Sequence, residues 1–366
     1  MSRVDFDHVW KIYPRGNVTA VKDLTFTCND GEFMAILGPS GSGKSSTLRM
    51  LAGLEDITRG KILFDDHVVN HLEPAQRNIA LAFETYALYQ RMSVYENIAF
   101  PLRARKMKGP EVDRKVKWVS DILDLDPVLD TTPGQLSGGH QQRVGLARAF
   151  VREPNVTLLD EPISHMDQRV RHELRARIRR LHEDLGLTTV YVTHDQAEAV
   201  SLCDRMIILH QAEMQQIGTV EEIWNKPANR FVAYFVGEPA MNFIDGIVEN
   251  CQSVTVPTGE GRKVFSFNGK IGPKYVGSNV SIGVRPQQIH ISRKKEKADI
   301  PGTVKVIEFQ GDRVILTVML SDKNHTEIKA VVSAGEKYKR EENVRLHFPP
   351  DYIHLFDGDT PVIKRD

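Results

Sequence analysis

A glycine-rich segment between an apolar run and an amphipathic run constrains the fold of this chain more than any other feature. Residues 32–37 are apolar enough to predict a strand, residues 38–45 read Gly-Pro-Ser-Gly-Ser-Gly-Lys-Ser, and residues 46–52 predict a helix that ends at Gly53. Glycines at this spacing let backbone N–H groups turn toward an anion, and the helix N-terminus adds positive potential. The strand, loop and helix together predict a phosphate-binding loop in an α/β fold.

The loop also carries the polar groups that a phosphate ligand and its metal ion need. Lys44 supplies a positive charge, and the hydroxyl of Ser45 is suited to bind Mg²⁺. We expect contacts to a nucleotide from the whole loop and the residue after it: Gly38, Pro39, Ser40, Gly41, Ser42, Gly43, Lys44, Ser45 and Ser46.

Two further apolar runs end in polar residues that suit the same chemistry. Residues 156–159 precede Asp160 and Glu161, and residues 187–193 precede His194. The carboxyl ends of parallel strands form one edge of a sheet, where ligands usually bind. We expect Asp160 to hold Mg²⁺ through its water shell, Glu161 to orient or deprotonate an attacking water, and His194 to sense the γ-phosphate. A structural role is the alternative interpretation for a single histidine.

Composition excludes several other classes of protein. The 48 Lys and Arg residues balance 48 Asp and Glu residues, so the whole-chain charge gives no support for binding to nucleic acid. Cys28, Cys203 and Cys251 are too few and too widely spaced for a disulfide framework, which favours a reducing compartment. The N-terminal segment does not resemble a secretory signal, and no run of about 18 apolar residues occurs. Any role at a membrane is therefore expected to depend on partner chains.

The character of the sequence changes near residue 240, and a length of 366 residues suggests two or three domains. Residues 1–235 alternate short β-branched runs with longer amphipathic stretches, which predicts an α/β layer. After residue 240 the runs are short, β-rich and separated by Gly, Pro, Asp or Asn, which predicts a small barrel or sandwich. The strands expected there are 264–268, 280–284, 288–292, 302–307, 314–320, 327–332 and 344–348.

A further motif lies between the phosphate loop and the acidic strand end, where residues 136–143 read Leu-Ser-Gly-Gly-His-Gln-Gln-Arg. This segment resembles the signature motif of ABC-transporter ATPases, and the order of all four motifs matches that family across residues 1–235. Each motif occurs once, so we expect a single ATPase cassette. In this family two cassettes meet head to tail, which implies ATP and Mg²⁺ as ligands and signature residues that contact the nucleotide of the partner. These residues are Ser137, Gly138, Gly139 and His140.

The resemblance extends to residues around the phosphate site. Tyr13 corresponds to the aromatic residue that stacks on adenine, and a buried core tyrosine is the alternative interpretation. Residues 164–167 correspond to the loop that crosses the dimer interface. Residues 83–98 resemble the Q-loop region, through which importer ATPases touch the coupling helices of their membrane partners.

Two positions depart from the family pattern. Glu84 stands where the family has glutamine, and we expect it both to ligate the metal and to act as a catalytic group beside the attacking water. Its carboxylate adds negative charge next to the γ-phosphate, which predicts slower or conditional hydrolysis. His140 also replaces glutamine and is expected to weaken the contact to the partner's nucleotide. These departures leave open whether the chain forms a homodimer or pairs with a different ATPase subunit.

The C-terminal part has a resemblance of its own. Residues 241–244 and 282–287 resemble the accessory domain of importer ATPases of the maltose and glycerol-phosphate type. That domain is an oligomer-binding-type barrel with a role in dimer contact and regulation. Arg285 and Pro286 are then expected to be structural rather than catalytic.

These resemblances predict two domains. Residues 1–238 are expected to form a phosphate-loop ABC ATPase domain of α/β class, with a RecA-like core and a helical subdomain at roughly 88–152. Residues 239–366 are expected to form the all-β barrel domain.

The expected function is ATP binding and hydrolysis that energises an ABC importer of a small polar solute such as a sugar, polyol or glycerol derivative. Its expected partners are two membrane-spanning permease subunits, a solute-binding protein and a second ATPase subunit, with no nucleic acid, at the cytoplasmic face of the inner membrane. The alternative is a weakly hydrolysing, nucleotide-gated regulatory subunit in a heterodimeric ATPase pair. ABC ATPases of DNA repair or translation are disfavoured, because long coiled-coil insertions and a second cassette are missing from the sequence.

Overall fold

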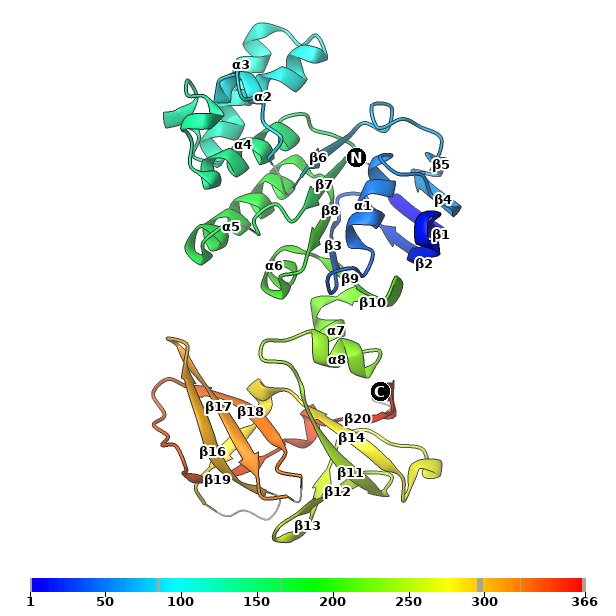
Figure 1. The fold of residues 1–366 in the computed structure, drawn as a ribbon, viewed down its shortest axis with the longest axis vertical. Coiled ribbons are helices and arrows are strands. Elements are labelled where there is room, and N and C mark those ends of the chain that lie inside the picture. Colours follow the sequence, from blue (N-terminus) through cyan, green and yellow to red (C-terminus); the bar gives the residue numbers. More distant parts are fainter. Residues whose placement is uncertain (1, 84–85, 165, 295–298, 323, 364–366) are drawn as a thin grey trace. The chain divides into compact units, whose positions relative to one another are not determined.

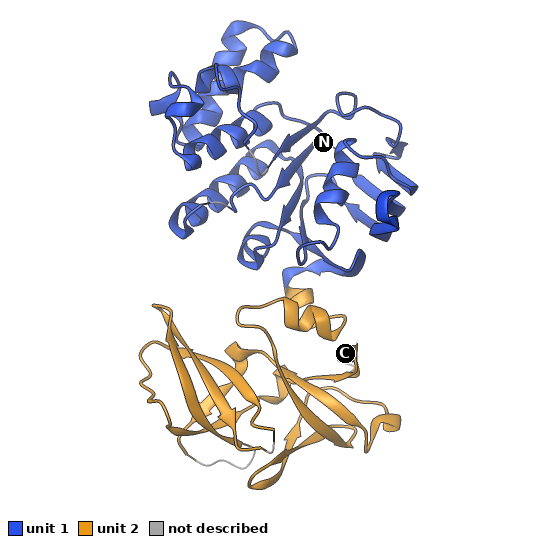
Figure 2. Cartoon of the chain, in the orientation of Figure 1, with its two compact units in different colours: residues 1–220 blue, residues 221–366 orange. Residues whose placement is uncertain are grey.

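The computed structural model describes residues 2–83, 86–164, 166–294, 299–322 and 324–363. The chain divides into two compact units, Met1–Val220 and Glu221–Asp366 (Figure 2). Among the residues that the structure describes, no helix has both the length and the apolar composition needed to cross a membrane.

The first unit is built on a mostly parallel sheet with the strand order β10-β9-β3-β8-β7-β6 (Figure 1). The pairs β9–β3, β3–β8, β8–β7 and β7–β6 are parallel, and β10 pairs antiparallel with β9. Every residue of β3 and of β8 is buried, as expected for strands covered on both faces. The strand bounds are β3 (Phe33–Leu37), β6 (Ile79–Ala82), β7 (Val156–Asp160), β8 (Thr188–Thr193), β9 (Arg205–His210) and β10 (Glu213–Thr219).

A second, antiparallel sheet of this unit packs over helix α1 (Lys44–Ala52). One apolar core contains residues of this helix and of both sheets, including Phe6, Leu48, Met34 and Val190. The helix therefore lies between the two sheets, with its N-terminus directly after the loop that follows β3. The strand order is β2-β1-β4-β5, with bounds β1 (Val4–Tyr13), β2 (Val18–Cys28), β4 (Arg59–Phe64) and β5 (His67–Val68).

The segment between β6 and β7 forms a group of helices (Figure 1). Helix α2 begins after Ser93, whose hydroxyl accepts a hydrogen bond from the Glu96 N–H at 3.1 Å while the Glu96 carboxylate accepts from the Ser93 N–H at 2.8 Å. These helices lie within the interval 88–152 that the sequence predicts to be helical. They pack with α5 in a second core. The bounds are α2 (Val94–Ala104), α3 (Gly109–Ile122), α4 (Gly138–Phe150) and α5 (Gln168–Leu185).

A buried carboxylate holds the carboxyl end of β8. Glu198 belongs to helix α6 (Gln196–Leu202) and is fully buried, and its Oε2 accepts hydrogen bonds from Tyr191 Oη at 2.8 Å and Thr193 Oγ1 at 2.7 Å. Thr193 Oγ1 in turn accepts a bond from the Asp195 N–H at 2.9 Å. Burial is the main cause of a raised pKa at Glu198. The bonds fix the strand end on both sides of residue 194.

The second unit starts with two short helices, and its described residues then form two antiparallel sheets around one apolar core. This confirms the all-β fold expected for the C-terminal domain. The helices are α7 (Val220–Asn225) and α8 (Arg230–Phe235). One sheet has the order β13-β12-β11-β14-β20-β21, with bounds β11 (Asn242–Asn250), β12 (Ser253–Thr258), β13 (Gly261–Ser266), β14 (Asn279–Val284), β20 (His354–Asp357) and β21 (Thr360–Pro361). The other has the order β15-β19-β16-β17-β18, with bounds β15 (His290–Ser292), β16 (Ile300–Phe309), β17 (Arg313–Leu320), β18 (Glu327–Ser333) and β19 (Asn343–His347).

Arg285 attaches the two short helices to the end of β14. Its guanidinium lies 3.8 Å from the ring centroid of Trp224, donates to the Trp224 carbonyl from Nε and Nη2 at 3.2 and 2.8 Å, and donates to the Val236 carbonyl from Nη1. The residue is 1% exposed, and burial lowers its pKa to about 10. The geometry agrees with the structural role expected for Arg285. It also explains why the compact units divide at 220/221, earlier than the domain boundary predicted at 238/239.

Replacing Arg285 by alanine should destabilise the second unit by roughly 3 kcal/mol, because two buried carbonyl groups lose their donors and Trp224 loses a stacked cation. Thermal unfolding of the full chain, followed by tryptophan fluorescence, measures the effect. Arg262→Ala is the matched control, since Arg262 is exposed on β13. Equal unfolding midpoints for the two variants would contradict the assigned role.

Glu198→Gln should change how stability depends on pH. Because the folded-state pKa of Glu198 lies above its unfolded value, the folded protein holds the proton more tightly, so the free energy of unfolding falls as pH rises between these two values. The glutamine variant lacks this decrease, which amounts to about 1.4 kcal/mol per pH unit across that interval. Chemical denaturation of both proteins across the acidic to neutral range measures it. Parallel stability profiles would contradict the prediction.

Candidate nucleotide site

The loop between β3 and α1 can only be built from glycine at two of its positions. Gly43 has a φ of 104°, and a Cβ on it would lie 2.3 Å from the Ala20 carbonyl oxygen. A Cβ on Gly38 would lie 2.3 Å from the carbonyl oxygen of Leu209. The helix then begins at Lys44, so its first N–H groups face the loop. The predicted strand, loop and helix are confirmed, with Gly53 as the left-handed cap that ends α1.

Two polar side chains inside the loop fit a phosphate ligand. Lys44 Nζ donates to the carbonyls of Gly38 and Pro39 at 2.8 and 3.0 Å, and burial lowers its pKa while Glu161 and Asp160 act to raise it. The Ser42 hydroxyl is buried and has no hydrogen-bond partner among the described residues. Within the described part of the chain, this buried cation has no carboxylate in direct contact and lies beside an unpaired hydroxyl and the N-terminus of a helix, an arrangement that is suited to an anion.

The predicted acidic residues come together at the carboxyl edge of the sheet. Asp160 is the last residue of β7 and pairs with Val192 of β8, and the Glu161 N–H donates to the Val192 carbonyl at 2.9 Å. Glu161 has a φ of 46°, an uncommon conformation for a residue with a side chain. This turn carries its carboxylate out of the strand direction, and Oε2 lies 2.9 Å from His194 Nδ1.

These residues lie close enough to act together. Leu37 at the end of β3 pairs with Thr193 at the end of β8, so the loop that carries Lys44 and the residue His194 leave the sheet at the same level. His194 is 57% exposed and Glu161 is 22% exposed, so both can reach a ligand at the edge. A carboxylate that is oriented by a histidine and faces a phosphate-binding loop can position a water for attack on phosphorus. Ser45, the other expected metal ligand, is exposed in the first turn of α1.

Tyr13 lies at the end of β1 beside the first turn of α1. Its hydroxyl donates to Glu55 and lies 3.0 Å from the Ser46 hydroxyl, and Lys11 Nζ lies 4.8 Å from the ring centroid. Burial, followed by the hydrogen bond to Glu55, raises the pKa of Tyr13. The structure therefore brings two predicted nucleotide contacts, Tyr13 and Ser46, together outside the apolar core. Stacking of this ring on adenine stays a prediction.

The signature residues lie at the start of α4, on the helical part of the unit. Ser137 and Gly138 are exposed, and the Ser137 hydroxyl is the cap of α4, with its oxygen 2.8 Å from His140 Nδ1 and 3.4 Å from the His140 N–H nitrogen. Gly139 completes the turn. Among the described residues no hydrogen bond joins this segment to the phosphate loop. That the signature serves a nucleotide on another subunit stays a prediction.

Two predicted positions lie outside the described residues. These are Glu84, the expected metal ligand and catalytic group, and His165 in the loop expected at the dimer interface. The neighbours of His165 are placed: Ser164 Oγ donates to the Glu161 carbonyl at 3.0 Å, and Asp167 caps α5 by accepting from the Val170 N–H.

The first unit also contains an apolar groove with a basic rim, which was not predicted from the sequence. The groove encloses about 440 Å³ and has Tyr89 and Phe100 on its wall, where the two ring centroids are 4.8 Å apart. Arg148 stacks over Tyr89 at 5.4 Å and donates to the carbonyls of Ala87 and Tyr86. The arginines at positions 148 and 152, which lie in the last turn of α4 and just after its end, are the signal in the sequence that could have indicated a basic face. The remaining lining residues are Ala75, Ala80, Leu81, Pro101, Ala104, Arg105, Ala149 and Arg152.

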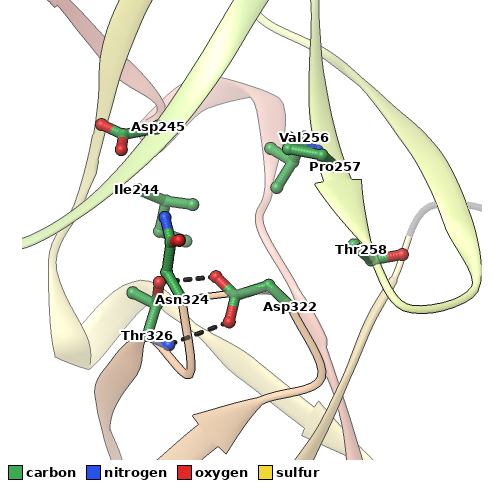
Figure 3. Close-up of a pocket in the computed structure, with 8 residues that line it drawn as sticks. All are labelled: Ile244, Asp245, Val256, Pro257, Thr258, Asp322, Asn324 and Thr326. Carbon is green, nitrogen blue, oxygen red and sulfur yellow. Dashed lines mark hydrogen bonds between the residues drawn. The ribbon is translucent and has the colours of Figure 1, made fainter.

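A pocket of about 200 Å³ in the second unit does not suit a triphosphate (Figure 3). It presents the carboxylates of Asp245 and Asp322, and the Asp322 carboxylate accepts bonds from the Thr326 N–H and hydroxyl at 2.9 and 2.6 Å. The described residues that line it include no Lys or Arg. Carboxylates without a cation repel phosphate. The geometry therefore favours the first unit as the nucleotide site.

Comparison with known proteins agrees with this geometry. Residues 21–164 match the ABC transporter family model, and residues 282–356 match the TOBE domain model. The chain is 40% identical to the trehalose/maltose import ATP-binding protein of Thermococcus litoralis, over 98% of this chain and 99% of that protein. It is 39% identical to the sn-glycerol-3-phosphate import ATP-binding protein of Psychromonas ingrahamii, over 98% of this chain and 95% of that protein.

A solved structure gives the same result. A dimeric ATP-binding cassette in a post-hydrolysis state, bound to ADP and Pi, is 30% identical to this chain and superposes with a TM-score of 0.55. The match covers 59% of this chain and 98% of that one. The resemblance that the motifs carried is thus confirmed over the length of the sequence, and the chain belongs to the family of ABC transporter ATP-binding proteins.

Proposed function

We propose that this chain is the ATP-hydrolysing subunit of an ABC importer for a sugar, polyol or glycerol derivative. The observation that carries the proposal is the convergence of Lys44, Asp160, Glu161 and His194 at the carboxyl edge of one sheet. The names of the relatives, which are import ATP-binding proteins for trehalose or maltose and for glycerol 3-phosphate, support the importer and its class of solute.

The residues of the site divide the chemistry between them. Lys44, Ser42 and the backbone N–H groups of residues 40–46 bind the phosphates, and Tyr13 stacks on the adenine. Ser45 and Asp160 provide the hydroxyl and carboxylate oxygens that Mg²⁺ prefers, and the ion neutralises phosphate charge when bound. Glu161, oriented by His194, positions the attacking water and accepts its proton.

Two such subunits are proposed to meet head to tail, so that the signature segment at Ser137 of each completes the nucleotide site of the other. The exposure of Ser137 and Gly138 at the N-terminus of α4 supports this, since both can reach a neighbouring molecule. The matched cassette that binds ADP and Pi is itself dimeric. ATP binding would close the pair and hydrolysis would reopen it, with differential affinity for the two states as the source of work.

The groove between α2 and α4 is proposed to receive a cytoplasmic helix of each permease subunit. Tyr89 and Phe100 are 42% and 40% exposed, which is unusual for two large rings in contact. A helix with an apolar stripe and acidic flanks fits this wall and the arginines on its rim. Contact with a permease, whose opposite face would receive the solute-binding protein, would place the chain at the cytoplasmic face of the inner membrane.

The alternative is a weakly hydrolysing, nucleotide-gated subunit in a heterodimeric pair. His140 at the signature is the described residue that favours it, together with Glu84 in the sequence. Hydrolysis by the assembled complex, with and without Glu84→Gln, separates the two functions. A large gain in turnover would show that the natural residue suppresses hydrolysis and would favour the alternative.

Glu161→Gln should retain ATP binding and lower turnover by about 10²-fold or more, because the attacking water loses its carboxylate. Phosphate release by the purified full chain and binding of a fluorescent ATP analogue measure the two effects. Glu249→Gln, at an exposed position of β11, is the matched control and should keep turnover at the natural rate. Undiminished hydrolysis by the Glu161 variant would reject the catalytic assignment.

Phe100→Ser should reduce recovery of the chain with its permease subunits by about fivefold or more, since the groove loses a central aromatic contact. Co-purification from membranes after a wash at fixed salt measures the effect. Val200→Ser is the control, because Val200 is 41% exposed on α6 and lies outside the groove lining. Equal recovery of both variants would mean that the permease binds elsewhere.

A further inference from the structure

The hydroxyl of Ser137 is engaged by a titratable side chain from its own helix turn. His140 Nδ1 lies 2.8 Å from Ser137 Oγ, and the His140 N–H lies behind the same oxygen at 3.4 Å. A serine hydroxyl has one hydrogen to donate and two lone pairs that accept. Whether Nδ1 donates or accepts therefore decides whether the hydroxyl can donate a hydrogen bond to another group.

We propose that His140 is a positioning residue that makes the contact between Ser137 and the partner's nucleotide depend on protonation. The proposal rests on the proposed function, in which Ser137 approaches a phosphate bound to the second subunit. It goes beyond that function because it assigns a proton-linked step to closure of the dimer.

The direction of the hydrogen bond between Ser137 and His140 gives the reason. When Nδ1 carries no hydrogen, the Ser137 hydroxyl donates its hydrogen to Nδ1. Only the lone pairs of Oγ are then left to face an arriving phosphate. When Nδ1 carries a hydrogen, the ring donates to Oγ, and the hydroxyl hydrogen is released to donate to a phosphate oxygen. Neutral imidazole carries a hydrogen on Nδ1 in only one of its two tautomers. Imidazolium always carries it and adds a positive charge.

The surroundings of His140 favour its neutral form in the free subunit. Burial, followed by the charge of Arg143 one turn further along α4, lowers the pKa of His140. Arg143 is itself near Asp124, which follows α3, and near Arg177 and Glu173 of α5.

Among the described residues, the elements packed against the signature turn leave the phosphate as the main new charge. The Tyr86 hydroxyl would lie 3.5 Å from a Cβ on Gly138, and Met166 would lie at the same distance from one on Gly139. Neither neighbour supplies a carboxylate to stabilise imidazolium. An arriving phosphate does so, and by linkage the closed dimer takes up protons and forms more readily as pH falls.

Glutamine, the residue that the family places here, does not titrate. Its amide can donate to Ser137 at any pH, so the His140→Gln variant should close with the same affinity across the range. With histidine at this position, the contact between Ser137 and the partner's nucleotide depends on pH, although His140 itself does not touch the reacting atoms.

The test measures ATP-driven dimerisation of the full chain in a Glu161→Gln background, in which hydrolysis does not consume the ATP. Light scattering gives the ATP concentration for half-maximal dimer at pH values between about 6 and 8. With His140 this concentration should rise by about threefold to tenfold from the acidic to the basic end, and with His140→Gln it should change by less than about twofold. His194 is present in both proteins, so any effect that it has on dimerisation is common to both.

Two further variants locate the effect. Ser137→Ala, with His140 retained, should lose most of the pH response, because it removes the hydroxyl whose hydrogen bonding depends on the protonation of His140. His67→Gln, on the exposed strand β5, should keep the full response and controls for the loss of a histidine. Equal pH responses in the His140 and His140→Gln proteins would overturn the inference while leaving the proposed function intact. Failure of ATP to assemble a dimer from any variant would reject the proposed function and this inference with it.

Discussion

Parallel pairing of β3 with β8 and of β8 with β7 is the constraint on which the site in the first unit depends. The register sets Leu37 against Thr193 and Asp160 against Val192, so the phosphate loop, the carboxylates and the histidine leave the sheet at one edge. A shift of one residue would turn the end of a strand to the opposite face. The buried Glu198, bonded to two hydroxyls of β8, adds a second restraint on the strand end that carries His194.

Lys44 and Arg285 show two ways in which this chain accommodates a buried cation. Both donate to backbone carbonyls, and burial lowers the pKa of each. Arg285 also has an aromatic ring against its face, so its site is complete and serves structure. Lys44 lies next to the N-terminus of a helix and a hydroxyl that has no partner in the described part of the chain, so its site is suited to an anion. Burial of a charge is unfavourable in both places. In the second unit the protein itself compensates for it, and in the first unit a bound ligand would do so.

Much of this could be predicted from the sequence because its signals are local. The glycine loop, the acidic strand end and the signature are each contiguous, and the strands predicted after residue 240 all overlap observed strands. β11, β12 and β20 were not predicted; in β11 the pair Asp245-Gly246 interrupts the apolar pattern, although cross-strand pairing with β14 keeps the strand continuous. The groove around Tyr89 and Phe100 also escaped prediction, since its lining comes from segments that are separated in the chain.

The sequence by itself determined that this protein has a phosphate loop, an ABC signature and a β-rich C-terminal domain, because those features need only neighbouring residues in a given order. Tertiary structure alone decided that Glu161 meets His194 and that Arg285 joins helices α7 and α8 to β14. These contacts depend on where side chains point after strands pair and helices are capped. Such directions follow from packing and hydrogen bonding in three dimensions, which a one-dimensional pattern does not specify.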